Sequence, residues 1–243
     1  MFRISNLIRT IGRPTLERAI RSAARQTLAP LEIVVIDATG DLAPERAVSW
    51  PLVPPVRVVG GWPMNRPEAA NHGLDSAQGD LLIFLDDDDE FLPSHLESLV
   101  AALASAPEAV LAYGTTACVD ASGAVRGHVG QAFDRVALFE GNFIQMGAAL
   151  FRRSLLEKAC RFDERLESYQ DWDFWLQASG HGPFVHTGHA TNLWYSDQGS
   201  GGTGAGSNRD PERTAGCERL LRQKWWPTYA SLVGQPRSGA PPA

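Results

Sequence analysis

Four consecutive aspartates, Asp86 to Asp89, directly follow five apolar residues, Leu81 to Leu85. A run that is apolar on both faces is typical of a central strand in a parallel sheet, with helices covering both sides. Ligands of open α/β sheets bind beyond the carboxyl ends of such strands. Because adjacent like charges repel one another, a fold that holds four of them there needs a counter-charge. Oxygen ligands suit Mg²⁺ or Mn²⁺, so the stretch predicts a divalent cation site, with a solvated acidic loop as the alternative.

A second pair of carboxylates, Asp171 and Asp173, flanks Trp172 near the start of a predicted helix. Backbone N–H groups at the start of a helix favour carboxylates, so one interpretation of Asp171 is purely structural. The apolar side of this helix carries Trp172 and Trp175 at helical spacing.

The elements that must hold the aspartates alternate between strands and helices over residues 1–114. Strand-like runs end near Thr10, at Asp37 and just before Asp86, and each is followed by a turn. This alternation predicts a parallel sheet and a nucleotide-binding type of half-fold. We expect strands at 2–11, 31–36, 56–59, 81–85 and 109–113, and helices at 14–27, 67–78 and 93–106.

The second half of the chain changes character. The turn sequence at 120–123 predicts a hairpin over residues 115–133, and a strand at 147–151 and a short helix at 152–160 follow. We expect residues 1–198 to form a single domain, with a nucleotide-binding half (1–114) and an acceptor-binding half (115–198). Residues 199–210 are a glycine-rich, flexible loop that could act as a lid, and residues 211–243 hold a C-terminal helix, to about 226, and a disordered tail.

Composition narrows the classes of function. The 243 residues carry a formal net charge of −6, which argues against a nucleic-acid-binding protein. The three cysteines show no CxxC spacing, which favours reduced, buried thiols in a cytoplasmic protein. The residues after Met1 lack the apolar core of a signal peptide, and no run approaches the length of a membrane span.

Four segments, in order, resemble glycosyltransferase family 2, whose members have the GT-A fold. TIGRPTLERAIRSAARQ resembles the opening strand, turn and helix, and LEIVVIDATGD the strand that ends in a nucleotide-binding acid. AANHGLDSAQGDLLIFLDDDDEFLP resembles the asparagine-glycine helix and the DxD metal motif, and FDERLESYQDWDFWLQAS the segment with the catalytic base. The resemblance covers residues 3–195 and implies a Rossmann-like three-layer α/β/α sandwich with a central, mostly parallel sheet.

The resemblance also implies site residues. Thr10 and Arg13 would border the nucleotide pocket, Asp37 would accept a hydrogen bond from the base, commonly from uracil N3–H, and Asn71 would shape the pocket near the diphosphate. Asp86 would face the ribose with Asp87 beside it among the donor-binding residues, Asp88 would bind Mn²⁺ or Mg²⁺, and Asp171 would be the general base. The implied activity is metal-dependent, inverting transfer from a nucleotide-sugar, with UDP favoured, to a saccharide or lipid-linked saccharide, as in polysaccharide biosynthesis.

This chain departs from the family pattern at three positions. Ala38 stands where many relatives have a second aspartate, and Ala70 where an arginine often precedes the asparagine; Arg66, one helical turn earlier, offers a substitute charge. Gln170 replaces the glutamate common before the base. We expect Trp172 and Trp175 either to stack on an acceptor sugar or to pack in the core.

Several alternatives stay open. A nucleotidyltransferase shares this architecture, and a non-catalytic nucleotide-sugar-binding module would fit the departures. A haloacid-type phosphatase and an EF-hand fit less well, because Glu90 and Phe91 stand where those motifs need other residues. The Trp225-Trp226 pair, beside two basic residues, suggests peripheral contact with the inner face of a membrane as a further alternative.

Overall fold

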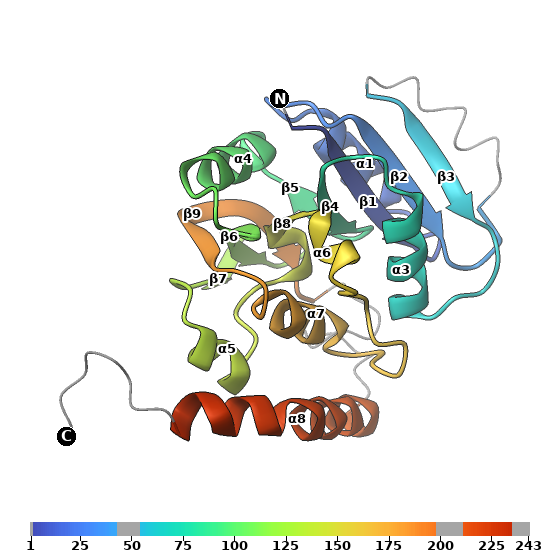
Figure 1. Ribbon diagram of the computed structural model, residues 1–243. Coiled ribbons are helices and arrows are strands. Elements are labelled where there is room, and N and C mark those ends of the chain that lie inside the picture. The colour runs from blue at the N-terminus through green and yellow to red at the C-terminus, as the bar shows by residue number, and fades with distance from the viewer. Residues whose placement is uncertain (1, 43–53, 198–210, 235–243) are drawn as a thin grey trace.

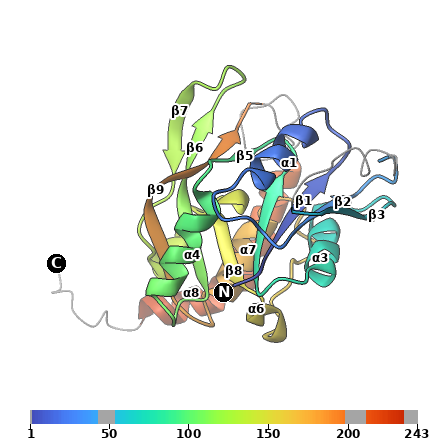
Figure 2. The ribbon, with the colours of Figure 1, turned by 90° about the horizontal axis from the view of Figure 1, so that it is seen from above.

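A computed structural model describes residues 2–42, 54–197 and 211–234. Within these residues nine strands form one sheet in the order β3-β2-β1-β4-β8-β6-β9-β5, with β7 paired to β6. Helices cover both faces of the sheet (Figure 1, Figure 2). The predicted three-layer α/β/α arrangement is confirmed.

The N-terminal half of the sheet is parallel, as predicted. β1 pairs with β2 and with β4, and β2 pairs with β3. All residues of β1 and β2 are buried, as expected for strands covered on both faces. The strands agree with the predicted ranges to within two residues: β1 is Ile4–Thr10, β2 Glu32–Asp37, β3 Val56–Gly60 and β4 Leu81–Asp86.

Apolar clusters lie on both faces of this sheet. Residues of α1 (Leu16–Ala24) and α4 (His95–Ser105) share one cluster with alternate residues of β1, β2 and β4. The other cluster contains residues of α3 (Arg66–Ser76) and α7 (Gln170–Ala178). A capping box formed by Asn65 and Glu68 begins α3, because each side chain accepts a hydrogen bond from the other residue's backbone N–H.

Beyond β4 the sheet is mixed. β8 (Ala149–Arg152) runs antiparallel to both β4 and β6 (Leu111–Val119), and β6 is parallel to β9 (Phe184–Tyr195). The predicted hairpin is formed by β6 and β7 (Val125–Val129), and the short helix by α6 (Ser154–Glu157). The sequence patterns did not predict β9, β5 (Glu90–Phe91), α5 (Arg135–Glu140) or the 3₁₀ turn at Met146–Ala148. The division into nucleotide-binding and acceptor-binding halves stays a prediction.

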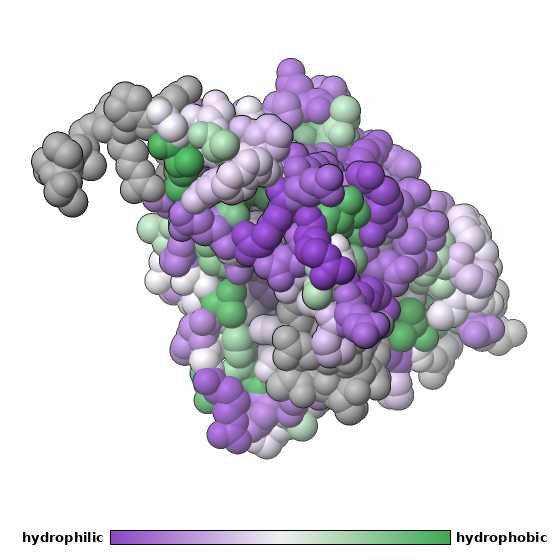
Figure 3. Space-filling model, turned by 90° about the horizontal axis from the view of Figure 1, so that it is seen from below, coloured by the Kyte–Doolittle hydropathy of each residue, from purple (hydrophilic) through white to green (hydrophobic). Residues whose placement is uncertain are grey.

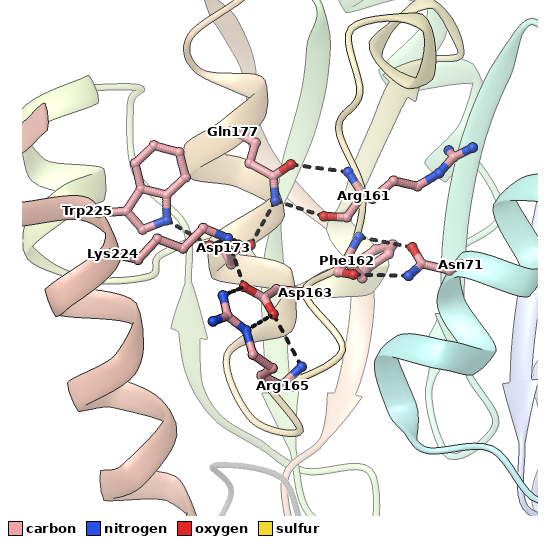
Figure 4. Close-up of polar contacts among 9 residues, drawn as sticks. All are labelled: Asn71, Arg161, Phe162, Asp163, Arg165, Asp173, Gln177, Lys224 and Trp225. Carbon is pink, nitrogen blue, oxygen red and sulfur yellow. Dashed lines mark hydrogen bonds and ion pairs between the residues drawn. The ribbon is translucent and has the colours of Figure 1, made fainter.

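The C-terminal helix α8 (Pro211–Gly234) extends past the predicted end and continues through Pro227. It runs along α5 and α7 and is anchored by buried Asp173 on α7 (Figure 1, Figure 4). The Asp173 carboxylate accepts hydrogen bonds from Lys224 Nζ at 2.9 Å and from Trp225 Nε1 at 2.7 Å. The predicted glycine-rich loop and tail lie outside the described residues.

The anchor of α8 predicts a measurable stability effect. Lys224→Met keeps the aliphatic stem but removes the ammonium group that neutralises the buried Asp173 carboxylate. We expect the free energy of unfolding to fall by about 1.5–3 kcal/mol, the range for hydrogen bonds to charged groups. Urea unfolding measures the loss, and Lys158→Met, at an exposed position, is the matched control. Equal stability of the two variants would contradict the role of Lys224.

His95 predicts a pH dependence of stability. Its ring is fully buried against Phe91, with centroids 4.2 Å apart, and burial lowers the pKa of His95 to about 3. The folded state therefore keeps the ring neutral, while the unfolded chain takes up a proton below the ordinary pKa of about 6.5. Stability is full above that pH and falls as the pH drops, by about 2 kcal/mol at pH 5 for this residue.

Urea unfolding at pH 5 and pH 8 tests this expectation. His95→Leu should lose less stability between the two pH values than the wild-type protein does, whereas His128→Gln, at an exposed position, should behave like the wild type. Identical pH slopes for His95→Leu and wild type would show that His95 does not titrate on unfolding.

Candidate active site

The acid cluster lies where the strand order reverses. β1 sits between β2 and β4, and the register aligns Thr10 with Asp37 and Arg9 with Asp86. The carboxyl ends of these three parallel strands therefore meet at one edge, the usual ligand site of open α/β sheets.

The first two aspartates of the cluster pair with side chains from the end of β1 and the turn after it. Asp86 Oδ1 lies 2.5 Å from Arg9 Nη2. Asp87, almost fully buried, accepts hydrogen bonds from Thr10 Oγ1 at 2.6 Å and Arg13 Nη1 at 2.5 Å. Four of the predicted residues thus lie together, and Asp87 ties the β1–α1 turn to the end of β4.

The last two aspartates are less well compensated. Burial, with the nearby charge of Asp86, raises the pKa of Asp88 to about 6. Burial likewise raises the pKa of Asp89, although its carboxylate accepts hydrogen bonds from Gln145 Nε2 and the Tyr195 N–H. Raised pKa values mean that this pocket disfavours the full negative charge without a further cation.

The cluster offers the oxygen ligands that a site for a hard cation requires. Asp86, Asp88 and Asp89 each offer a carboxylate oxygen, and these oxygens lie within 4.8 Å of one another. All-oxygen ligands suit Mg²⁺ and Mn²⁺, so the residues present fit such an ion. Asp89 was not among the predicted ligands; Gln145 and Tyr195, from the second half of the chain, hold it in place.

Two neighbouring cavities lie beside the cluster. A smaller one of about 200 Å³ is lined by the acid cluster, Thr10, Arg13 and Ala38. A larger one of about 420 Å³ is lined by Asp171 and residues of the second half. Arg66, Asp86 and Trp194 line both, so the cavity of Asp171 and the cavity of the acid cluster are neighbours that share part of their walls.

Asp171 stands at the start of α7, after Tyr169 in the left-handed backbone region (φ 62°). Its Oδ1 accepts a hydrogen bond from the Trp172 N–H at 2.8 Å, and its Oδ2 accepts one from Asn142 Nδ2 at 3.1 Å. Burial raises the pKa of Asp171. A carboxylate with a raised pKa on a cavity wall is suited to accept a proton, and it also satisfies the helix start.

Two of the predicted residues do not line either cavity. Both oxygens of the Asp37 carboxylate accept hydrogen bonds from its own loop, donated by Thr39, Gly40 and Leu42. Burial alone would raise the pKa of Asp37, but these hydrogen bonds hold the pKa below its ordinary value. The amide of Asn71 is paired with the backbone N–H and C=O of Phe162, at 3.0 Å each (Figure 4). Their predicted contacts with the donor stay predictions.

Several residues that were not predicted as site residues line the two cavities. The N-cap residue Asn65 and, on α3, Arg66 and Ala69 line the smaller cavity, and the N-x-x-E capping signal at Asn65 marks that helix start in the sequence. Trp194 was missed because β9 was not predicted. Trp172 and Trp175 both pack in the core, and their indole N–H groups donate to backbone carbonyls; Trp172 also forms part of the larger cavity wall.

Comparisons with known proteins agree on a family and a fold. The family model described as Glycosyl transferase family 2 matches residues 8–159. The uncharacterized glycosyltransferase YwdF of Bacillus subtilis (strain 168) is 29% identical over 185 residues, which are 73% of this chain and 68% of that protein. The crystal structure of S. aureus TarS 1-349 in complex with UDP-GlcNAc gives a TM-score of 0.72 at 17% identity, covering 91% of this chain and 66% of that one.

The likeness to TarS shows the fold, which is that of a GT-A glycosyltransferase. Another crystal structure of S. aureus TarS 1-349 gives a TM-score of 0.67, and this chain covers 65% of its length. For the longer TarS structure the TM-score is also 0.67 and the coverage is 39%. The chain therefore spans about two thirds of the shorter TarS structure and well under half of the longer one.

Proposed function

Because the chain belongs to glycosyl transferase family 2, we propose that it transfers a sugar from a nucleotide-sugar, with UDP as the nucleotide, to an acceptor hydroxyl group with inversion. Solved complexes of TarS with UDP-GlcNAc and with UDP support a nucleotide-sugar donor on this fold. The observation that carries the proposal is the pair of neighbouring cavities, one lined by the acid cluster and one by Asp171, which share Arg66, Asp86 and Trp194 as wall residues.

The smaller cavity is the proposed donor side. Asp86, Asp88 and Asp89 would hold Mg²⁺ or Mn²⁺ there, and such an ion would supply positive charge for the departing diphosphate. Arg66 lines the cavity next to this cluster and is the proposed substitute for the family arginine. Ala70, at the family position, is fully buried in the core, where an unpaired charge would cost free energy.

The larger cavity is the proposed acceptor side. An acceptor hydroxyl is a weak nucleophile at neutral pH, so a base must take its proton as it attacks the anomeric carbon. Asp171 is the proposed base, and Asn142 orients its carboxylate through the bond to Oδ2. With the base and the leaving group on opposite sides of the sugar, a single displacement inverts the anomeric centre.

A thermal-shift screen of nucleotide-sugars, with and without Mn²⁺, tests the donor assignment. A ligand that binds only the folded state stabilises it by about 2.7 kcal/mol at 100 times its dissociation constant. We expect a UDP-sugar to stabilise the protein, and only when Mn²⁺ is present. Stabilisation by nucleoside triphosphates alone would favour a nucleotidyltransferase, and donor binding without transfer or hydrolysis would favour a non-catalytic module.

Peripheral membrane contact through α8, with a place at the inner face of a membrane, stays a prediction. Among the described residues, no helix is both long and apolar enough to traverse a bilayer. Trp225 turns inward to Asp173, which leaves Trp226 as the exposed tryptophan of the pair, at 64% of its surface. The face that carries α8 is predominantly hydrophilic (Figure 3).

A further inference from the structure

The wall of the larger cavity contains a buried hydroxyl group without a partner. Ser168, three residues before the proposed base, is 3% exposed, and its Oγ makes no hydrogen bond within the described residues. Ser168 is one of the residues that line the larger cavity. Leaving a buried hydroxyl unpaired costs free energy, which a ligand hydroxyl in the cavity would recover.

Negative charge prevails on this side of the cleft. Glu140, Asp171 and Glu218 line the larger cavity away from its junction with the smaller one. Two guanidinium groups also line this cavity among the described residues: Arg66 at the junction, and Arg222, which lies 2.8 Å from Glu218 Oε1 and 5.5 Å from the centre of the Trp172 ring. With Asp86, the described wall carries four carboxylates against two guanidinium groups, so an anionic acceptor would meet a net negative charge.

Neutral hydrogen-bonding groups complete the wall. Asn142, Gln145 and Gln170 line the same cavity, together with Tyr169 and Trp172. Amide and carboxylate side chains form hydrogen bonds with hydroxyl groups, and aromatic side chains pack against apolar ring faces. Such a wall suits a ligand that has many hydroxyl groups and apolar ring faces.

Part of this wall comes from outside the residues that the family model matches. Glu218 and Arg222 belong to α8, whereas the match ends at residue 159. α8 lies against α5 and α7 (Figure 1) and is held there by the bonds from Lys224 and Trp225 to Asp173 (Figure 4). The charge of the acceptor side is therefore set in part by this chain's own C-terminal helix.

We infer that the larger cavity selects an uncharged saccharide as acceptor and that Ser168 Oγ hydrogen-bonds to one of its hydroxyl groups. The inference rests on the proposed function and names its acceptor class. Carboxylates of Glu140 and Glu218 discriminate against uronic acids and sugar phosphates, and Ser168 contributes to acceptor affinity without taking part in the proton transfer.

Paired acceptors that differ in one charge test the selectivity. The assay follows UDP release from UDP-glucose or UDP-GlcNAc with Mn²⁺, above the rate of hydrolysis. The acceptors are the p-nitrophenyl glycosides of glucose, galactose and N-acetylglucosamine, with the glucuronide and galacturonide as acidic counterparts. We expect kcat/KM to be at least about 10-fold higher for a neutral glycoside than for its acidic counterpart. In the double variant Glu140→Gln/Glu218→Gln, the ratio of these two kcat/KM values should be smaller.

Two results overturn the inference on selectivity. One is equal or better use of the acidic glycosides, and the other is hydrolysis of the donor with no stimulation by any sugar in the set. If the wild-type protein neither hydrolyses any nucleotide-sugar nor is stabilised by one, the proposed function itself is wrong. This outcome differs from both results above, so a failure of the proposed function can be told from a failure of the inference on selectivity.

Ser168→Ala tests the hydrogen bond itself. We expect KM for the neutral glycoside to rise about 3- to 10-fold and Tm to stay level or rise, because the variant loses a buried hydroxyl that makes no hydrogen bond in the free protein. The control Ser179→Ala removes a buried hydroxyl that donates to the Leu176 carbonyl and accepts from Arg135, so it should lower Tm and leave KM unchanged. An unchanged KM in Ser168→Ala would overturn the assignment of Ser168.

Discussion

Asp171→Asn should reduce the rate of sugar transfer by about 10²–10⁴-fold, the usual value of general-base assistance. Asparagine has nearly the same shape as aspartate and still accepts the hydrogen bond that Asp171 takes from the Trp172 N–H. It cannot take a proton from the acceptor hydroxyl. Because Asp171 lines the larger cavity and not the smaller one, donor affinity should stay within about twofold. Initial rates with saturating donor and donor titration by calorimetry measure the two effects separately.

The control and the pH profile make this test specific. Asp75→Asn removes an exposed carboxylate on α3, paired with Arg161, and should leave transfer unchanged. Transfer by the wild type should fall as the pH drops through the raised pKa of Asp171, since only the ionised carboxylate accepts a proton. A loss of donor affinity as large as the loss of rate would instead make Asp171 a donor ligand or a helix-start carboxylate.

Asp88→Asn should abolish the metal-dependent stabilisation by a nucleotide-sugar. Loss of a residue that only supports a metal ligand usually weakens metal affinity about 10–100-fold, so removal of a ligand should cost at least as much. Without metal, the variant should be more stable than wild type at pH 8, because burial and Asp86 disfavour the Asp88 charge, which raises its pKa to about 6. Below that pH the wild type also protonates Asp88, so the difference should shrink.

The same substitution at the neighbouring residue, Asp87, should have the opposite effect on the stability of the metal-free protein. Asp87 accepts hydrogen bonds from Thr10 and Arg13, so Asp87→Asn should lower the metal-free Tm where Asp88→Asn raises it. Thermal unfolding with and without Mn²⁺ and donor compares the two variants. Intact metal dependence in Asp88→Asn would remove this residue from the cation site.

Much of the donor side could be predicted from the sequence because its signals are local. A buried strand such as β4 is a continuous apolar run, and the residues after it lie at the sheet edge by geometry. The cluster formed by Asp86, Asp87, Thr10 and Arg13 follows from the ends of two adjacent parallel strands. Asn71 illustrates the limit: it lies on the predicted helix, but its amide is used to join α3 to the segment at Phe162.

The acceptor side depends on contacts that no local pattern contains. β9 mixes polar and apolar residues, is only partly buried, and is interrupted by Gly188 with φ 78°, so it shows neither strand alternation nor a buried run. Trp194 and the backbone contact from Tyr195 to Asp89 were missed together with that strand. The short helix α5 gives too little periodicity to be seen in the sequence.

Asp171 and Asp173 are two residues apart on one short helix, yet they face different environments. One borders the open cleft, and the other is sealed under Lys224 and Trp225. A shortened form that ended before α8 would leave the Asp173 carboxylate, near the proposed base, with its bond from Gln177 but without the cation of Lys224. Any attempt to trim the protein to its first 197 residues should therefore be paired with a neutral side chain at Asp173.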